Sequence, residues 1–380
     1  MTHIGAMPMF HTLFLALLLG ILATGGCAAR ADSDMEKDLA GIKLPEGFSI
    51  SLWARVPGAR SLAVAPEKGL VFVGTRGDKV YAVADRDQNG TAEDAFQIAS
   101  DLNMPNGVAW RASALYIAER HRLLRLPIGD LKPETRLKAE VLYEGLPDLR
   151  WHGWRYAAFG PDNGLYVAIG AACNVCALKG MEGTIQRFDP KTWKPQTHAT
   201  GVRNSVGLDF HPVTGNLFFT DNGADWMGDD SPHDELNRAD KAGHHFGFPF
   251  YGGGRARTDD FKGEKTPAGV RFPDIDFNAH VAPLGIRFYT GDSFPAAYRN
   301  DAFVAQHGSW NRAEPDGYRV MRIRFDAKGN ALRKEVFAEG WLKEGEAWGR
   351  PVDVAVLWDG SLLVSDDSAG AIYRITYTKP

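Results

Sequence analysis

Cysteine is scarce in this chain, with three residues among 380. Only Cys173 and Cys176 lie beyond the N-terminal region, in the sequence Cys-Asn-Val-Cys. Two thiolates cannot complete a structural zinc site alone, and a c-type haem would need a histidine where Ala177 stands. In an oxidising compartment, we therefore expect Cys173 and Cys176 to form a disulfide that stiffens their short loop.

A large excess of charge of one sign is also missing. The formal net charge is −4, and 24% of the residues are charged. No broad basic surface is expected, so nucleic acid is not a predicted partner, and a charged ligand would have to bind to a local cluster. The hydrophobic share of 44% supports a large core, and the 42 glycines and 21 prolines indicate many turns.

The N-terminal apolar run, Leu13–Ala23, has eleven residues, too few to span a bilayer comfortably. With the small residues that follow it, this run predicts a signal peptide over residues 1–27. Cys27 follows two glycines, as at a lipoprotein cleavage site where the cysteine becomes lipidated, whereas residues 29–31 (Ala-Arg-Ala) offer an ordinary cleavage site. We expect an exported protein, periplasmic or lipid-anchored to the outer membrane, with a linker over residues 28–40.

One pattern occurs six times along the chain: a small or apolar opening, an alternating strand, a turn and a second strand. The openings are 46, 49, 51, 78 and 67 residues apart, and they fall at Ser61, Gly107, Tyr156, Gly207, Gly285 and Val352. The shorter spacings suit one four-stranded propeller blade each, and the longer two must carry insertions. Residues 41–380 are therefore predicted to form an all-β, six-bladed β-propeller of four-stranded antiparallel blades. The strand at 48–54 would complete the last blade beside residues 371–377. A pair of β-sandwiches is less favoured, because the repeat is too long and too regular.

Residues 85–90 (Asp-Arg-Asp-Gln-Asn-Gly) carry oxygen-bearing side chains at alternate positions, as calcium loops do. The glutamate that closes an EF-hand loop is missing, since Phe96 occupies its position. We favour the alternative, a turn between two strands of the first blade in which Asp or Asn side chains bond the backbone.

Three groups of polar residues stand directly before predicted inner strands. His152 lies in a loop rich in Trp and Arg, Arg203 and Asn204 precede the fourth repeat, and Arg350 precedes the sixth. A histidine can act as a general base, although a histidine that caps a turn fits the same pattern. Arginine suits carboxylates and asparagine suits a quinone or carbonyl, whereas bonds to neighbouring blade carbonyls are the structural alternative.

A further acidic group combines the segment Asp221–Ala224 with the later segment Asp234–Asn237. Carboxylates, side-chain amides and the main-chain carbonyls of a flexible, glycine-containing loop favour a hard cation such as Ca²⁺ over zinc. A solvated acidic loop is the alternative. We expect these groups and His152 to converge on the axis of the propeller, since loops at one rim of such a fold carry function.

These segments resemble the quinoprotein glucose/sorbosone dehydrogenase family, whose members are propellers that bind pyrroloquinoline quinone (PQQ). The chain is most similar to the L-sorbosone dehydrogenase-like branch, and the resemblance spans about residues 41–377. It rests on five motifs in the family's order: HGWRYAAFGPDNGLYV at 152–167, GVRNSVGLDFHPVTGNLFFTDNG at 201–223, DELN at 234–237, HVAPLGIRFYTGDSFP at 280–295 and RPVDV at 350–354.

The resemblance implies a role for each matching residue. His152 would be the catalytic base, and Asp234 would contact the substrate. The main-chain carbonyls of Gly223 and Ala224 would hold a catalytic Ca²⁺. The residues that would bind the cofactor are Arg203, Asn204, Asn222, His307 and Arg350. Two positions depart from the family: Val352 replaces a second arginine, and Gln306-His307 replace a lysine. Fewer cations would then face a cofactor that carries three carboxylates.

The activity that the resemblance implies is oxidation of an aldose or a sorbosone-like aldehyde by hydride transfer to PQQ. Ca²⁺ would act as a Lewis acid, and an external quinone or cytochrome would accept the electrons. Two other classes stay open, because a fold alone does not define a function. One is a propeller that binds a ligand or partner without catalysis, and the other is a six-bladed calcium-dependent lactonase.

Overall fold

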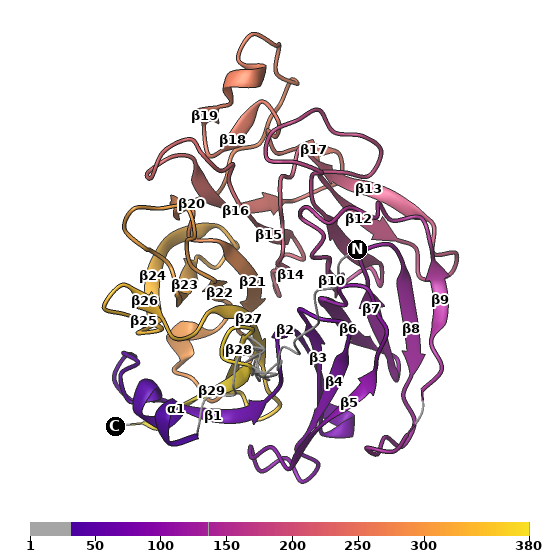
Figure 1. Cartoon of the computed structure of the whole chain (residues 1–380), viewed down its shortest axis with the longest axis vertical. Coiled ribbons are helices and arrows are strands. Elements are labelled where there is room, and N and C mark those ends of the chain that lie inside the picture. Colours follow the sequence, from indigo (N-terminus) through magenta and orange to yellow (C-terminus); the bar gives the residue numbers. More distant parts are fainter. Residues whose placement is uncertain (1–31, 136, 380) are drawn as a thin grey trace, which may run out of the picture.

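Each of the six repeats folds into an antiparallel sheet in the computed structural model, which describes residues 32–135 and 137–379. The sheets surround a common axis, which confirms the predicted all-β, six-bladed propeller (Figure 1). Blades one to three contain β2 (Ala59–Ala65), β3 (Leu70–Thr75), β4 (Val80–Ala84) and β5 (Asp94–Ala99); β6 (Gly107–Arg111), β7 (Ala114–Ala118), β8 (Leu123–Pro127) and β9 (Glu140–Tyr143); and β10 (Tyr156–Phe159), β11 (Leu165–Ile169), β12 (Thr184–Phe188) and β13 (Pro195–Thr200). Blades four to six contain β14 (Leu208–Phe210), β15 (Leu217–Asp221), β16 (His233–Ala239) and β20 (Ile275–Ala279); β21 (Pro283–Phe288), β22 (Ala302–Gln306), β23 (Arg319–Phe325) and β24 (Ala331–Glu339); and β27 (Pro351–Val356), β28 (Leu362–Asp366), β29 (Ala371–Tyr377) and β1 (Phe48–Arg55).

The first strand of each blade lies nearest the axis. β2, β6, β10, β14, β21 and β27 contact one another in sequence, and β27 contacts β2 to complete the ring. The repeat openings fall in these strands or directly before them. The sequence pattern therefore located the innermost strand of every blade.

The ring is closed by a strand from each end of the described chain. β1 pairs antiparallel with β29, with Phe48 opposite Tyr377 and Arg55 opposite Ala371. This pairing confirms that the strand at 48–54 completes the last blade. The seam spans almost the whole chain, so the loop closed by this pairing is the longest in the fold.

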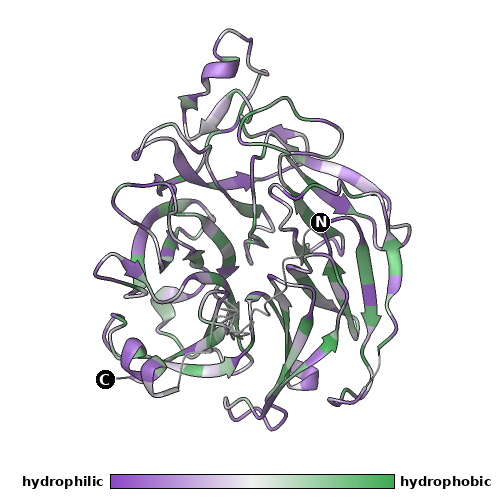
Figure 2. Ribbon diagram, in the orientation of Figure 1, coloured by the Kyte–Doolittle hydropathy of each residue, from purple (hydrophilic) through white to green (hydrophobic). Residues whose placement is uncertain are grey.

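The blades pack through apolar side chains on facing strands. Phe72 of blade one is fully buried against Leu115 and Leu124 of blade two, and five similar clusters occupy other blade interfaces. Burying one such side chain contributes about 1.5–3 kcal/mol. Figure 2 shows the hydrophobic residues concentrated on the strands, whereas many loops are hydrophilic.

The two longer repeat spacings contain the expected insertions. The segment between β16 and β20 adds β17 (His244–His245), which pairs parallel with β13, and the hairpin of β18 (Tyr251–Gly253) and β19 (Ala256–Arg257) that projects from the ring (Figure 1). The segment between β24 and β27 adds the hairpin of β25 (Leu342–Lys343) and β26 (Glu346–Ala347). Short 3₁₀ turns cover Pro66–Lys68, Asp259–Phe261 and Ala296–Tyr298.

The region before the propeller contains a helix where the sequence predicted a linker. α1 covers Asp32–Leu39, and Met35 and Leu39 are buried against blades five and six. The predicted signal peptide over residues 1–27, with Cys27, lies outside the described residues. Within the described residues, no helix is long and apolar enough to cross a membrane.

The segment at 85–90 is a turn between β4 and β5. The Gly90 N–H donates to Asp85 Oδ2 at 3.0 Å, and the Asn89 N–H donates to Asp87 Oδ1 at 3.2 Å. These are the side-chain to backbone bonds of the favoured turn.

Candidate active site

Loops from five blades enclose a pocket of about 620 Å³ at one end of the propeller. Antiparallel pairing places the start of each innermost strand beside the end of the second strand, so the loops at those positions share one face. The volume lies within the range of small-molecule sites. The predicted site residues that line this pocket are His152, Arg203, Asn204, Asn222, Gly223, Asp234, His307 and Arg350. Ala224 follows Gly223 but is not part of the lining.

The pocket carries an excess of positive charge. Five arginines line it, against the two carboxylates of Asp225 and Asp234. Sequence reasoning missed three of the arginines: Arg60 and Arg76 of blade one, and Arg150 in the loop before blade three. Arg60 stands directly before the first repeat opening, which is the type of position that pointed to Arg203 and Arg350, so a signal for it existed. The lining thus holds more arginines than the two, Arg203 and Arg350, to which the sequence motifs pointed.

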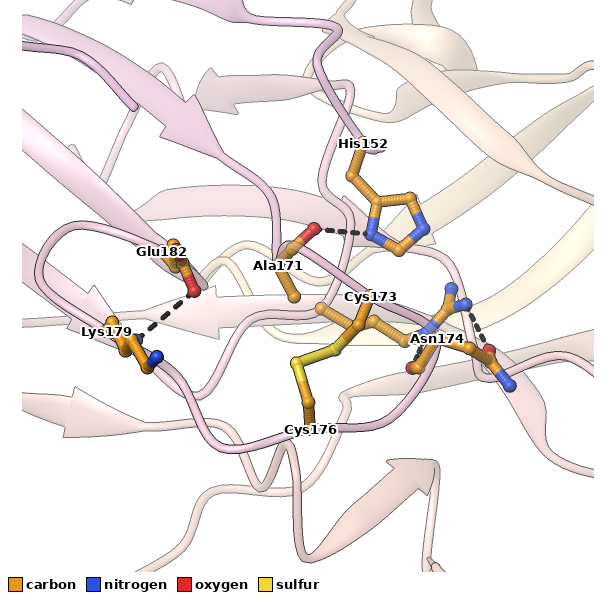
Figure 3. Close-up of a disulfide and its surroundings, with 8 residues drawn as sticks. His152, Ala171, Cys173, Asn174, Cys176, Lys179 and Glu182 are labelled. Atoms are coloured by element: carbon orange, nitrogen blue, oxygen red, sulfur yellow. Dashed lines mark hydrogen bonds between the residues drawn. A yellow bond between two sulfur atoms is a disulfide. The ribbon is translucent and has the colours of Figure 1, made fainter. Parts of the chain in front are cut away.

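His152 is held in a defined orientation. Its Nδ1 lies 3.0 Å from the carbonyl oxygen of Ala171, which can only accept, so Nδ1 carries the proton and Nε2 is the unprotonated nitrogen (Figure 3). The backbone of His152 is left-handed, with φ of 50°. A Cβ at Gly170 would lie 2.5 Å from the Cβ of His152, so glycine is required there. The surrounding structure thus holds His152 in an uncommon backbone conformation, which is typical of functional sites.

The electrostatic surroundings keep His152 neutral. Burial lowers its pKa well below the ordinary value of 6.5, and the charges of Arg203 and Arg155 lower it further, against the opposing effect of the bond to Ala171. Nε2 therefore has a free lone pair throughout the neutral pH range, and such a nitrogen can accept a proton from a bound hydroxyl.

A disulfide loop fixes Arg203. Cys173 and Cys176 are joined by a disulfide, and Figure 3 shows it beside Asn174 and close to the segment that bonds His152. The Asn174 carbonyl accepts from Arg203 Nε at 3.0 Å, and Asn174 Oδ1 accepts from Arg203 Nη2 at 2.7 Å. Arg203 Nη2 also pairs with Asp225 Oδ2 at 3.0 Å. The guanidinium is thus preorganised, and Asp225 offsets part of its charge.

Arg350 is anchored to backbone oxygens. Its Nε donates to the His307 carbonyl at 3.0 Å, and its Nη2 donates to the Gly308 carbonyl at 2.7 Å. The guanidinium also lies 5.3 Å from the centre of the Tyr318 ring. Bonding to backbone carbonyls, the structural alternative considered for Arg203, is observed for Arg203 and for Arg350, and both also line the pocket.

Asp234 connects two loops of the pocket. Its Oδ1 accepts from the Gly223 N–H at 2.7 Å, and its Oδ2 accepts from the Ala282 N–H at 2.9 Å. Burial raises the pKa of Asp234 to about 6, although these two bonds oppose the shift. Both oxygens already bond the backbone, so the structure shows an anchoring role for Asp234. Its contact with a substrate stays a prediction.

Several oxygens in the pocket are suited to a cation or to a ligand's donor groups. Asn204 Oδ1 and Asn311 Oδ1 are buried without a hydrogen-bond partner. Within residues 32–135 and 137–379, the carbonyls of Gly223 and Ala224 accept no hydrogen bond. Asn222 orients this region, since its Nδ2 donates to the Asn204 carbonyl at 2.8 Å. Amide and main-chain oxygens are among the ligands of Ca²⁺.

Asp367 organises the blade-one side of the pocket. It accepts from Arg60 Nη1 at 2.6 Å and from Arg76 Nη1 at 3.1 Å, and it lies 2.8 Å from His307 Nε2. Although burial opposes the shift, His307, Arg60 and Arg76 hold the pKa of Asp367 far below its usual range. Arg60 stacks on Trp154, with 4.4 Å between the guanidinium carbon and the ring centre. Only Arg76 in this group has a largely exposed side chain, at 58%.

Replacing Asp367 with alanine is expected to lower the free energy of unfolding by about 3–5 kcal/mol, because Arg60 would stay buried without its partner. Urea denaturation monitored by circular dichroism measures the change. The matched control is Asp292→Ala, which removes the exposed partner of Arg299 and should cost less than about 1 kcal/mol. Equal effects of the two substitutions would contradict this role of Asp367.

A small apolar cluster borders the pocket, and three of its members, Trp154, Val206 and Leu284, line it. Val352 is buried with Val206 and Leu284, and Trp154 packs against them. The position where the sugar dehydrogenases have a second arginine is thus part of a small hydrophobic cluster here. Arg60 and Arg76 supply positive charge from the neighbouring blade instead.

Comparisons with known proteins agree with this fold. An uncharacterised protein of Borreliella burgdorferi is 34% identical over 355 residues, which cover 89% of this chain and 91% of that protein. The TrAA12-like family model matches residues 235–378. A PQQ-dependent pyranose dehydrogenase of Coprinopsis cinerea is 29% identical over 141 residues, covering 31% of this chain and 19% of that enzyme.

Solved structures show the same architecture. The Trichoderma reesei enzyme of carbohydrate-active family AA12 aligns with a TM-score of 0.76 at 19% identity, covering 89% of this chain and 98% of that one. The holo form of the pyranose dehydrogenase PQQ domain from Coprinopsis cinerea aligns with a TM-score of 0.72 at 18% identity, covering 88% and 97%. These structures share the six-bladed propeller fold with this chain. The chain is related over most of its length to the uncharacterised Borreliella protein, and the shorter matches to the TrAA12-like model and to the pyranose dehydrogenase are consistent with a quinoprotein sugar dehydrogenase-like family.

Proposed function

We propose that this protein oxidises a sugar or a sugar-derived aldehyde by hydride transfer to PQQ, with Ca²⁺ as Lewis acid. The observation that carries the proposal is the meeting of a neutral, oriented histidine with five arginines in one pocket of about 620 Å³. Relatives whose names describe PQQ-dependent sugar oxidation support it. The finer assignment, an aldose or a sorbosone-like aldehyde as substrate, rests on the sequence motifs.

The residues present fit a quinone with three carboxylates. Arginine forks pair with carboxylates bidentately, and Arg60, Arg76, Arg150, Arg203 and Arg350 come from different segments around the pocket. The buried, unpartnered Oδ1 atoms of Asn204 and Asn311 offer acceptors or cation ligands. When bound, the quinone would accept the hydride and Ca²⁺ would polarise it.

The chain itself contributes proton transfer and positioning. His152 Nε2 would take the proton of the substrate hydroxyl, while the bond to Ala171 keeps the ring oriented. Arg203 and Arg350 are fixed by backbone oxygens before any ligand arrives, so little reorganisation is needed on binding. Gly223 and Ala224 would hold Ca²⁺ through main-chain oxygens.

Two further parts of the proposal concern the surroundings of the enzyme. An external quinone or cytochrome would accept the electrons, because the sequence holds no haem attachment motif. An exported location, periplasmic or lipid-anchored, would suit the disulfide between Cys173 and Cys176. Among the described residues, no group of three or more His, Cys, Asp or Glu side chains could hold a metal, so Ca²⁺ in this pocket would be held mainly by amide and main-chain oxygens.

The test is reconstitution of the purified protein with PQQ and Ca²⁺. We expect a bound quinone chromophore that an aldose or aldehyde substrate bleaches. Removing Ca²⁺ with a strong chelator should abolish activity, and Ca²⁺ should restore it better than Mg²⁺, since Mg²⁺ demands a near-ideal octahedron. Absorbance and a dye-linked rate measure both effects.

Two outcomes would count against the proposal. Failure to bind PQQ at roughly 50 μM, where even a weak complex forms, would favour the propeller that binds a ligand without catalysis. Activity unaffected by chelation would contradict the assignment of Ca²⁺. The variant His152→Asn is the internal control, because it should keep the chromophore and lose the bleaching.

A further inference from the structure

Exposed tryptophans gather at the mouth of the pocket. Trp151, Trp226 and Trp310 are exposed to 49%, 69% and 60%, whereas the other seven tryptophans, all in the described part of the chain, are buried or partly buried. Trp151 and Trp310 line the pocket. Trp226 packs edge-on against Trp310, with 5.1 Å between ring centres and an angle of 87°. The chain thus places its exposed indoles at one site.

The loops that carry this pair are bonded to each other. Asn311 Nδ2 donates to Asp225 Oδ1 at 3.1 Å, and these residues are the direct neighbours of Trp310 and Trp226. The Ala313 N–H donates to Asp229 Oδ2 at 3.0 Å. Trp226 has a left-handed backbone with φ of 68°, which is uncommon for a bulky residue. The bonds between the two loops therefore hold the pair in its exposed position. A surface that is already ordered loses little entropy on binding.

Exposed indoles beside polar groups suit a particular ligand chemistry. Tryptophan is usually well buried, and an aromatic patch rimmed by polar residues typically marks a binding surface. The electron-rich face of an indole attracts positively polarised hydrogens, which the C–H faces of a pyranose ring present. The Oδ1 atom of Asn311, beside the pair, has no hydrogen-bond partner and can accept from a hydroxyl group. A sugar ring carries both features, and the patch is continuous with the pocket through Trp310.

We propose that Trp226 and Trp310 form a subsite for a second sugar ring, so that the substrate is an oligosaccharide or the end of a glycan chain. The terminal ring would enter the pocket toward His152 while the next ring stacks on the exposed indoles. This inference rests on the proposed function, because it extends the pocket's sugar substrate outward by one unit.

The test compares saccharides of different length on the holoenzyme. Glucose is compared with cello-, malto-, xylo- and chito-tetraose. We expect at least one tetrasaccharide to have a lower KM than glucose, and Trp226→Ala should raise that KM about tenfold with little change in kcat, as expected for lost ground-state and transition-state binding alike. Trp226→Tyr should recover part of the loss. Leu332→Ala is the matched control, since Leu332 is exposed to 60% on β24 and does not line the pocket.

Binding to the protein without cofactor separates this inference from the proposed function. The same tetrasaccharide should quench tryptophan fluorescence, and Trp226→Ala should weaken that binding about tenfold. If quinone binds but no tetrasaccharide binds better than glucose, the subsite is overturned and the proposed function stands. If tetrasaccharide binds but quinone does not, the subsite stands and the proposed function fails. If Trp226→Ala changes only the KM for a protein electron acceptor, the patch docks that acceptor and the subsite is overturned.

Discussion

Replacing His152 with asparagine is expected to lower kcat by about 10²–10⁴-fold, because the change removes the proposed general base. Asparagine tolerates the left-handed backbone at this position better than most residues do, so the fold and quinone affinity should be kept. Steady-state rates on reconstituted protein, with quinone titration by fluorescence quenching, measure both quantities. His152→Ala should give the same loss of turnover with a small added cost in stability.

The pH profile offers a second readout for His152. A histidine whose folded pKa is lowered is neutral above that pKa, so the base form persists as the pH falls through 6.5. The acid limb of kcat/KM in the wild type is therefore expected well below pH 6.5, and it should disappear in the asparagine variant. Turnover near the wild-type level in His152→Asn would overturn the assignment of the base.

Replacing Arg350 with alanine is expected to weaken quinone binding by at least about a hundredfold. Loss of one partner from a desolvated, charge-paired site costs about 2–5 kcal/mol. Arg350 also ties the carbonyls of His307 and Gly308, so its loss would loosen the loop that carries Trp310. Fluorescence titration of the quinone measures the dissociation constant.

Two variants control for charge and for general effects of losing an arginine. Arg350→Lys keeps the charge without the planar fork and should recover only part of the affinity. Arg299→Ala removes an exposed arginine paired with Asp292, away from the pocket, and should leave the affinity unchanged. Tight binding in Arg350→Ala would show that the other four arginines suffice to neutralise the cofactor.

The fold was largely predictable because its signal is local and periodic. Each blade begins with a strand of alternating polarity followed by a turn, and the openings at Ser61, Gly107 and Tyr156 lie in β2, β6 and β10. α1 was missed because eight mostly polar residues, with Met35 and Leu39 as their only buried contacts, give no clear helical period. Its position depends on the surface of blades five and six, which no local pattern describes.

Only the site residues that lie in recognisable sequence motifs could be predicted. His152, Arg203 and Arg350 stand in recognisable segments before inner strands, and they do line one pocket. Arg60 and Arg76 were missed because their relevance comes from Asp367, which is distant in sequence and adjacent in space. Trp226 and Trp310 are also distant in sequence and come from different blades. They contact each other only because the folded propeller places those two blades side by side.

The seam between β1 and β29 has a consequence for how the protein is made. Blade six lacks its outer strand until these two strands meet, and the chain at its inner strands supplies Arg350 to the pocket and Asp367 to Arg60. Blade six follows the other blades in the sequence, so a chain synthesised only as far as blade five lacks both Arg350 and Asp367. Such long-range pairing also forms late in folding. Under the proposed function, quinone loading would therefore report that blade six has been synthesised and that the ring has closed.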